Sequence, residues 1–158
     1  MNGTAIFRVR QPGLLTTVQD RGRVGRQREG MVVAGAMDPF ASQIANVLVG
    51  NSRDEAVLEI TLLGPVLEAL DDVLIAVCGA DLTARLDGEP LPLWRALEIR
   101  QGQILRFGGR LAGARAYLAV ADGFDVPCVL GSRATFLRGG IGGFEGRGQR
   151  RFLHGSHS

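Results

Sequence analysis

The sequence has 158 residues, of which 46% are hydrophobic and 22% are charged, and these proportions are typical of one globular domain. All 18 basic residues are arginine, which excludes Schiff-base chemistry, a phosphate-loop lysine and a lysine general base. The formal net charge is only +2, so nucleic acid is not an expected partner.

Short strands separated by Gly and Pro dominate the predicted elements. In chain order, the apolar or alternating stretches that predict strands are residues 5–9, 15–18, 57–62, 73–78, 82–86, 104–107 and 116–121. Two hairpins are expected, one with a type I′ turn at Asp87 and Gly88, and one with a longer loop at 100–103. These short links predict antiparallel pairing, and a small barrel or sandwich would protect the sheet edges.

One helix is predicted between the second and third strands. Asp38 is a suitable N-cap, Pro39 suits the first helical position, and Gly50 suits the C-terminal end. The apolar stripe of this helix is expected to close one end of the sheet, and it consists of Phe40, Ile44, Val47 and Leu48.

The C-terminal stretch differs in composition from the rest of the chain. Residues 133–151 contain five Arg and six Gly but only one acidic residue, Glu145, and no hydrophobic period continues beyond Phe144. We therefore expect residues 1–145 to form the folded unit and residues 146–158 to form a flexible tail. The tail histidines, His154 and His157, receive no metal assignment.

Localisation and redox state also follow from the sequence. The first ten residues lack the apolar core of a signal peptide, and the longest uncharged apolar run, 73–80, is far shorter than the roughly 20 residues of a membrane span. These features predict a cytoplasmic protein that does not enter a membrane. Cys78 and Cys128 lie in apolar surroundings without CxxC spacing, which favours buried thiols over a zinc or redox site.

Several polar positions suit a binding site, although each also has a purely structural explanation. Gln19, Asp20 and Arg21 could bind a polar substrate or form an internal salt bridge. Asp81 ends a buried strand, where it could act as an acid or base or simply form a turn. Glu59 either faces solvent or lines a pocket, and alternation along its strand does not decide between these positions.

Glycine-rich and helix-start segments are further candidates. The glycines at 139, 140, 142 and 143, after Arg138, suit either an anion-binding loop or a flexible connector. The segment 35–39 could present helix-start amides to an oxygen atom of a ligand, although capping alone explains Asp38.

These segments carry a resemblance to a known family. The chain resembles the family of the bacterial 5-oxoprolinase C subunit, also called allophanate hydrolase subunit 2, the Kip-type antagonist and the biotin-dependent carboxyltransferase domain. The matching blocks follow one another in family order and span nearly the whole chain: 12–23, 35–41, 58–61, 79–82, 115–121, 123–127, 130–133 and 140–146. Family members continue after the last block into a second half, so the chain resembles the N-terminal half only.

The resemblance implies a fold and an activity. The fold it implies is a mainly β, cyclophilin-like small β-barrel with one short helix, in which residues 1–145 are the N-terminal half of a carboxyltransferase-like domain. The implied activity is a hydrolase reaction on a cyclic amide, the ATP-dependent conversion of 5-oxoproline (pyroglutamate) to glutamate by a complex with subunits A and B. A separate second half or self-association is also expected, and the half-length chain alone is expected to be inactive.

Roles for individual residues follow from the same blocks. The resemblance implies catalytic roles for Asp38 and Asp81, in orienting a water molecule or a ring amide, and pairing of Arg133 with a substrate carboxylate. The remaining substrate-binding positions are Gln19, Asp20, Met37 and Glu59. No cofactor is expected on this chain, since ATP would be used by the complex.

Two other functions remain open. One is a biotin-dependent carboxyltransferase component that acts on urea or a related amide, and only this alternative requires biotin. The other is a regulatory binding module without chemistry of its own, like the Kip-type antagonist.

Overall fold

The computed structural model describes residues 5–11, 13, 15–19, 38–109, 112–125 and 152–155. Its elements are β-strands in two antiparallel sheets and one α-helix, which confirms the mainly β fold with a single short helix. No helix among the described residues is long and apolar enough to cross a membrane.

The larger sheet has seven strands in the order β11-β12-β1-β4-β9-β6-β7. Within it, the strand at one end of the chain pairs with the strand at the other, because β12 is bound to both β1 and β11. The bounds are β1 Ala5–Gln11, β4 Val66–Ala69, β6 Arg85–Leu86, β7 Glu89–Pro90, β9 Ile104–Arg106, β11 Phe124–Asp125 and β12 Phe152–Gly155.

The smaller sheet has five strands in the order β2-β3-β10-β5-β8, and it carries the candidate site. Its bounds are β2 Leu15–Gln19, β3 Val57–Thr61, β5 Val73–Asp81, β8 Ala96–Ile99 and β10 Ala112–Val120. The two sheets pack around one apolar core to which both contribute buried side chains, such as Phe7 and Leu67 from the larger sheet and Leu58 and Ile75 from the smaller one.

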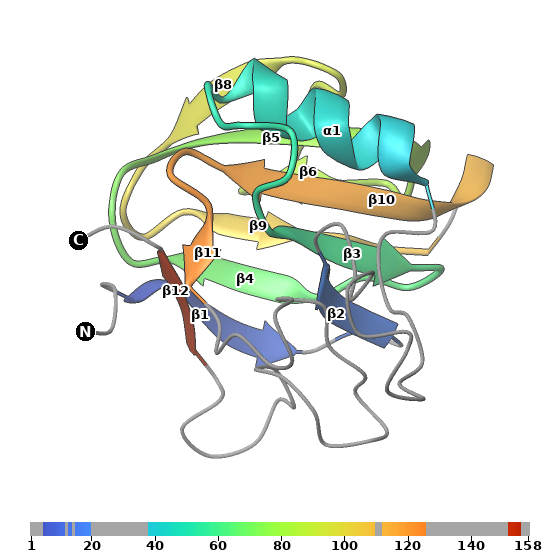
Figure 1. Ribbon diagram of the computed structural model, residues 1–158. Coiled ribbons are helices and arrows are strands. Elements are labelled where there is room, and N and C mark those ends of the chain that lie inside the picture. The colour runs from blue at the N-terminus through green and yellow to red at the C-terminus, as the bar shows by residue number, and fades with distance from the viewer. Residues whose placement is uncertain are drawn as a thin grey trace, which may run out of the picture.

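Helix α1, Pro39–Leu48, lies across the outer face of the smaller sheet, where it contacts β5 and β10 (Figure 1). Its ends are as predicted: the Asp38 carboxylate accepts a hydrogen bond from the Ala41 N–H at 3.1 Å, Pro39 opens the helix, and Gly50 follows its last turn with a φ of +85°. Capping of this kind satisfies amides that have no partner inside the helix.

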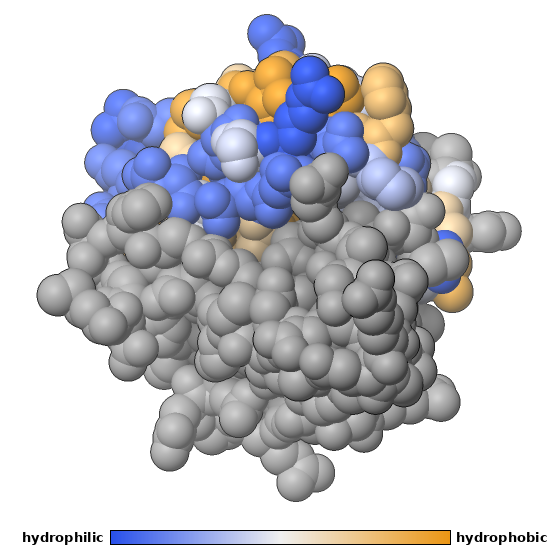
Figure 2. Space-filling model, in the orientation of Figure 1, coloured by the Kyte–Doolittle hydropathy of each residue, from blue (hydrophilic) through white to orange (hydrophobic). Residues whose placement is uncertain are grey.

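The face by which α1 packs differs from the predicted one. The buried residues on the sheet side are small, namely Ala41, Ser42, Ala45 and Asn46, whereas Phe40 is 68% exposed and Val47 is 51% exposed. The apolar surface in the upper part of Figure 2 lies where Figure 1 shows this helix. Small side chains face the sheet because the strands beneath are also lined with small residues, Ala76, Cys78 and Ala119, so the helix lies close to them.

Two other predictions need correction. The turn at 100–103 forms, with a hydrogen bond from the Gln103 N–H to the Arg100 carbonyl, but it connects β8 of one sheet to β9 of the other and is no hairpin. Part of the predicted flexible tail, Phe152–Gly155, is strand β12. The Asp87-Gly88 hairpin is confirmed, since both residues have positive φ and β6 pairs with β7.

Candidate functional site

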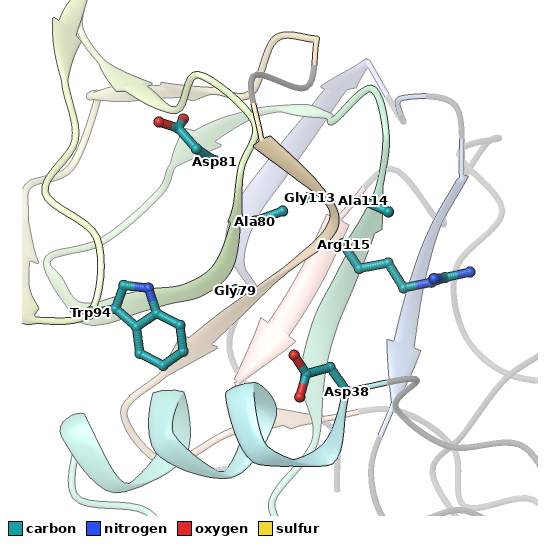
Figure 3. A pocket seen from close by; sticks show the side chains of 8 residues that line it. All are labelled: Asp38, Gly79, Ala80, Asp81, Trp94, Gly113, Ala114 and Arg115. Atoms are coloured by element: carbon teal, nitrogen blue, oxygen red, sulfur yellow. The ribbon is translucent and has the colours of Figure 1, made fainter.

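A cavity of about 550 Å³ opens beside the start of α1, at the point where β5 and β10 diverge from regular pairing. Figure 3 shows its lining: Asp38, Gly79, Ala80, Asp81, Trp94, Gly113, Ala114 and Arg115. These residues come from four parts of the chain, namely the helix start, β5, the loop before β8, and β10.

A β-bulge shapes the floor of the cavity. Ala112 pairs with Asp81 and Ala116 pairs with Gly79, so four steps along β10 oppose only two along β5. Gly79 has a φ of +98°, and a Cβ atom there would lie 2.7 Å from the Arg115 carbonyl oxygen, so the strand needs glycine at this position. Bulges of this type commonly reorient side chains next to binding sites.

Two carboxylates and one indole surround the opening. In Figure 3 the Asp38 carboxylate points into the cavity from the helix start, Asp81 lies on the opposite side, and the Trp94 ring faces the cavity from the loop before β8. Asp81 also accepts a hydrogen bond from the Thr83 N–H at 2.9 Å. The turn-forming explanation of Asp81 is therefore correct, and the same carboxylate lines the cavity.

A buried polar pair supports the helix start from below. The Tyr117 hydroxyl donates a hydrogen bond to Glu59 Oε2 at 2.6 Å and accepts one from the Asp38 backbone N–H at 2.8 Å. Tyr117 is fully buried, and burial, followed by the hydrogen bond to the Glu59 carboxylate and its charge, raises the pKa of the phenol well above its usual value. Tyr117 therefore stays neutral and acts as a hydrogen-bond bridge, not as an acid or base.

The structure places the predicted site residues unequally. Asp38 and Asp81 line one cavity, and Glu59 lies inside the protein, linked to Asp38 through Tyr117. Gln19 belongs to β2, opposite Val57, but its side chain lies outside the described residues, as do Asp20, Met37 and Arg133. The glycines at 139–143, Arg21 and Cys128 also lie outside them. Cys78 is buried and free, as predicted.

Three residues near the cavity were missed by the sequence reasoning. Trp94 is not preceded by any strand or helix pattern, Arg115 reads as an ordinary strand residue, and Tyr117 occupies an apolar run. Only the spacing of Arg115 and Tyr117, two residues apart and so on one face of β10, could have suggested that they act together. Among the described residues, no group of three or more His, Cys, Asp or Glu side chains could hold a metal ion.

Comparison with known proteins places these features in a family context. The family model for the carboxyltransferase domain, subdomain A and B, matches residues 29–151. The chain is 44% identical to the C subunit of 5-oxoprolinase from Escherichia coli over 142 residues, which is 90% of this chain and 46% of that protein. It is 39% identical to urea amidolyase of Saccharomyces cerevisiae over 137 residues, 86% of this chain and 8% of that protein.

The fold is shared as well. The crystal structure of Kluyveromyces lactis urea carboxylase superposes with a TM-score of 0.87 at 39% identity, and the match covers 96% of this chain and 14% of the other. The chain thus spans less than half the length of each of these three proteins.

Proposed function

Because the chain belongs to the family of carboxyltransferase domains, subdomain A and B, we propose that it is a component of an ATP-dependent 5-oxoprolinase complex. The observation that carries the proposal is the 44% identity with the C subunit of Escherichia coli 5-oxoprolinase over 90% of this chain. The complex would hydrolyse 5-oxoproline to glutamate together with subunits A and B, and the chain would act in the cytoplasm.

The cavity supports this function through its chemistry. The Asp38 and Asp81 carboxylates are hydrogen-bond acceptors at the opening, and a cyclic amide offers a ring N–H as donor. The flat apolar face of the Trp94 indole suits the ring atoms of such a substrate. Either carboxylate can also hold a water molecule or receive its proton when the ring amide is attacked.

The position of Asp38 is fixed by the fold and not by substrate. Its side chain is held by the Ala41 N–H and its backbone N–H by the Tyr117 hydroxyl, so the carboxylate is oriented before any ligand enters. Pre-organisation of this kind reduces the entropy lost when a reacting group is positioned.

Turnover in a reconstituted complex tests the proposal. Glutamate formation from 5-oxoproline and ATP is measured with this chain plus subunits A and B, with controls that omit each component in turn. We expect turnover that requires this chain and that falls at least tenfold in Asp38→Asn, which keeps the helix cap but lacks the charge. A full-length homologue from the same family that restores turnover where this chain gives none would contradict a sufficient role for the chain as it stands.

A second candidate function has its own supporting observation, the 39% identity with urea amidolyase. In that case a carboxylated biotin, carried by another protein, would supply the carboxyl group. Asp38 and Asp81 fit the N–H groups of urea, and Arg115 fits a carboxylate, so the described residues suit this chemistry too. Turnover of urea with a biotin carboxylase, and none of 5-oxoproline, would favour it.

A further inference from the structure

Arg115 has no ion pair or hydrogen bond through its guanidinium within the part of the chain that the structure describes, although the residue is partly buried. Figure 3 shows its side chain running from β10 away from Asp38 and Asp81, in the direction of β3 and β2. A partly buried guanidinium without a carboxylate beside it is an unusual feature, since a buried charge is costly unless it is paired.

The residue opposite Arg115 provides an independent sign of a ligand. Thr61 on β3 is directly paired with Arg115, so both side chains lie on the same face of the sheet with their Cβ atoms about 4.5–5.5 Å apart. Thr61 is 9% exposed, and its Oγ1 atom is buried without a hydrogen-bond partner among the described residues. A buried hydroxyl left without a partner costs about 1–3 kcal/mol, which a bound acceptor would recover.

The face that carries Arg115 and Thr61 is the face of the cavity. The next pair along the same two strands on that face is Tyr117 with Glu59, and Tyr117 contacts the backbone of Asp38 at the helix start. The site therefore has an acidic side, formed by Asp38 and Asp81, and a cationic side, formed by Arg115 beside a hydroxyl donor. This separation suits a ligand with an N–H group at one end and an anionic oxygen at the other.

We propose that Arg115 and the Thr61 hydroxyl form a carboxylate-binding subsite, so that the substrate of this cavity is a cyclic amide that bears a carboxylate, not neutral urea. The proposal deepens the proposed function, since it rests on the same cavity and names the substrate class. Arg115 would donate paired N–H bonds to the carboxylate, and Thr61 would donate its O–H to one of the carboxylate oxygens. The ring N–H would then face Asp38 or Asp81.

Trp94 provides the readout that tests the proposal on the chain itself. It is the only tryptophan in the sequence, it lines the cavity, and it is 44% exposed, so its fluorescence reports occupancy without any need for turnover. The chain is titrated with 5-oxoproline, with the methyl ester of 5-oxoproline, which keeps the ring but loses the charge, and with urea. The same titrations are done with Arg115→Gln, Thr61→Val and, as a matched control that removes an exposed arginine elsewhere, Arg100→Gln.

We expect 5-oxoproline to bind the unmodified chain about 10- to 100-fold more tightly than its methyl ester, as loss of a charged hydrogen-bonding group predicts. Arg115→Gln should abolish this difference, Thr61→Val should reduce it several-fold, and Arg100→Gln should leave it unchanged. Equal binding of acid and ester, an unchanged preference in Arg115→Gln, tighter binding of urea, or no binding of 5-oxoproline would each overturn the subsite. Thermal unfolding of each variant confirms that it is folded.

The outcome is separable from that of the proposed function. Turnover of 5-oxoproline by the reconstituted complex with an acid preference that does not depend on Arg115 would leave the proposed function intact and remove the subsite. Binding that depends on Arg115, in a complex that does not turn over, would support the subsite and remove the proposed function.

Discussion

Tyr117 has a hydroxyl group that is used fully, as donor to Glu59 and as acceptor from the Asp38 N–H. The bond to Glu59 is short at 2.6 Å and has a carboxylate acceptor, and such bonds are about twice as strong as neutral ones. The pair therefore connects the interior of the smaller sheet to the first residue of the helix, and it holds the backbone of a residue that lines the cavity.

Replacement of Tyr117 by Phe tests this connection. The variant leaves the Asp38 N–H without its acceptor and Glu59 without one donor, so we expect the free energy of unfolding to fall by about 1–3 kcal/mol. Urea unfolding gives this value, and amide hydrogen exchange should show faster exchange at Asp38. Glu59→Gln, which keeps an oxygen acceptor for the Tyr117 hydroxyl, should lose less. A Tyr117→Phe variant as stable as the unmodified chain would contradict the bridging role.

The Cys78 thiol predicts a dependence of stability on pH. Burial raises the pKa of Cys78 from 9.0 to about 11, so the folded chain holds this proton at pH values where the unfolded chain has released it. The contribution to stability is therefore complete below pH 9 and is lost as pH rises towards 11. Between pH 8 and pH 10 we expect the free energy of unfolding to fall by about 1.4 kcal/mol from this group alone.

Comparison with Cys78→Ala isolates the effect of the thiol. Unfolding in urea is measured for both proteins at pH 8, 9 and 10, and the difference between their free energies is followed, which cancels the other groups that titrate. The difference should narrow as pH rises, because the alanine variant has no thiol to ionise. A difference that is constant over this range would mean that the Cys78 thiol is not shielded from solvent.

Glu59 shows how far single residues can be interpreted from sequence. Its position in an apolar strand allowed either face, and the choice depended on Tyr117, which lies 58 positions further along the chain. Thr61 and Arg115 became a candidate pair only through the register of β3 with β10. Asp38, by contrast, was predictable as a cap because its partner, the Ala41 amide, is three residues away. Sequence therefore predicts the local part of the site and not the part made by pairing.

At the scale of elements, helix α1 shows why an apolar stripe does not determine the packed face. Phe40 and Val47 are exposed, whereas Ala45 is fully buried against the smaller sheet. Helix periodicity identifies a face that is apolar, but the closeness of helix and sheet depends on the sizes of the side chains on both. Because Ala76 and Ala119 line the sheet here, the alanine face of the helix fits against it.

Two substitutions in α1 are expected to have unequal effects. Ala45→Leu adds a branched side chain where there is no space, and we expect it to lower the free energy of unfolding by about 1–3 kcal/mol. Val47→Ala alters a half-exposed position on the opposite side, and its effect should stay within about 0.5 kcal/mol. Urea unfolding of both variants gives the comparison. A greater loss in Val47→Ala than in Ala45→Leu would mean that the apolar stripe predicted from sequence is the packed face.

At the scale of the whole molecule, the mainly β composition and several strand positions were predictable, because each depends on residues close in sequence. The division into two sheets was not. The turn at 100–103 looks like a hairpin in sequence, yet β8 pairs with β5 and β9 pairs with β4 and β6. Strand partners depend on how buried faces meet across the core, and such long-range pairing leaves no local signal.

Strand β12 is the clearest case of a pairing that composition concealed. It follows a glycine- and arginine-rich stretch, which predicted a flexible tail, but its backbone pairs with β1 at Ala5, Phe7 and Arg8 and with β11 at Phe124 and Asp125. It is therefore the strand that joins β11 to the rest of the larger sheet. A four-residue strand needs little periodicity of its own when two strands already flank its place.

Truncation of the chain tests the contribution of β12. Removal of residues 152–158 would expose the backbone N–H and C=O groups of β1 along one edge and deprive β11 of the partner that the described sheet gives it. Open edges of this kind pair with other chains, so we expect a lower free energy of unfolding and concentration-dependent association, measured by urea unfolding and light scattering. Removal of residues 156–158 alone leaves β12 in place, and this shorter truncation should behave like the unmodified chain. If both truncated proteins were equally stable and monomeric, β12 would not contribute to the larger sheet in solution, and the tail would be as flexible as its composition suggests.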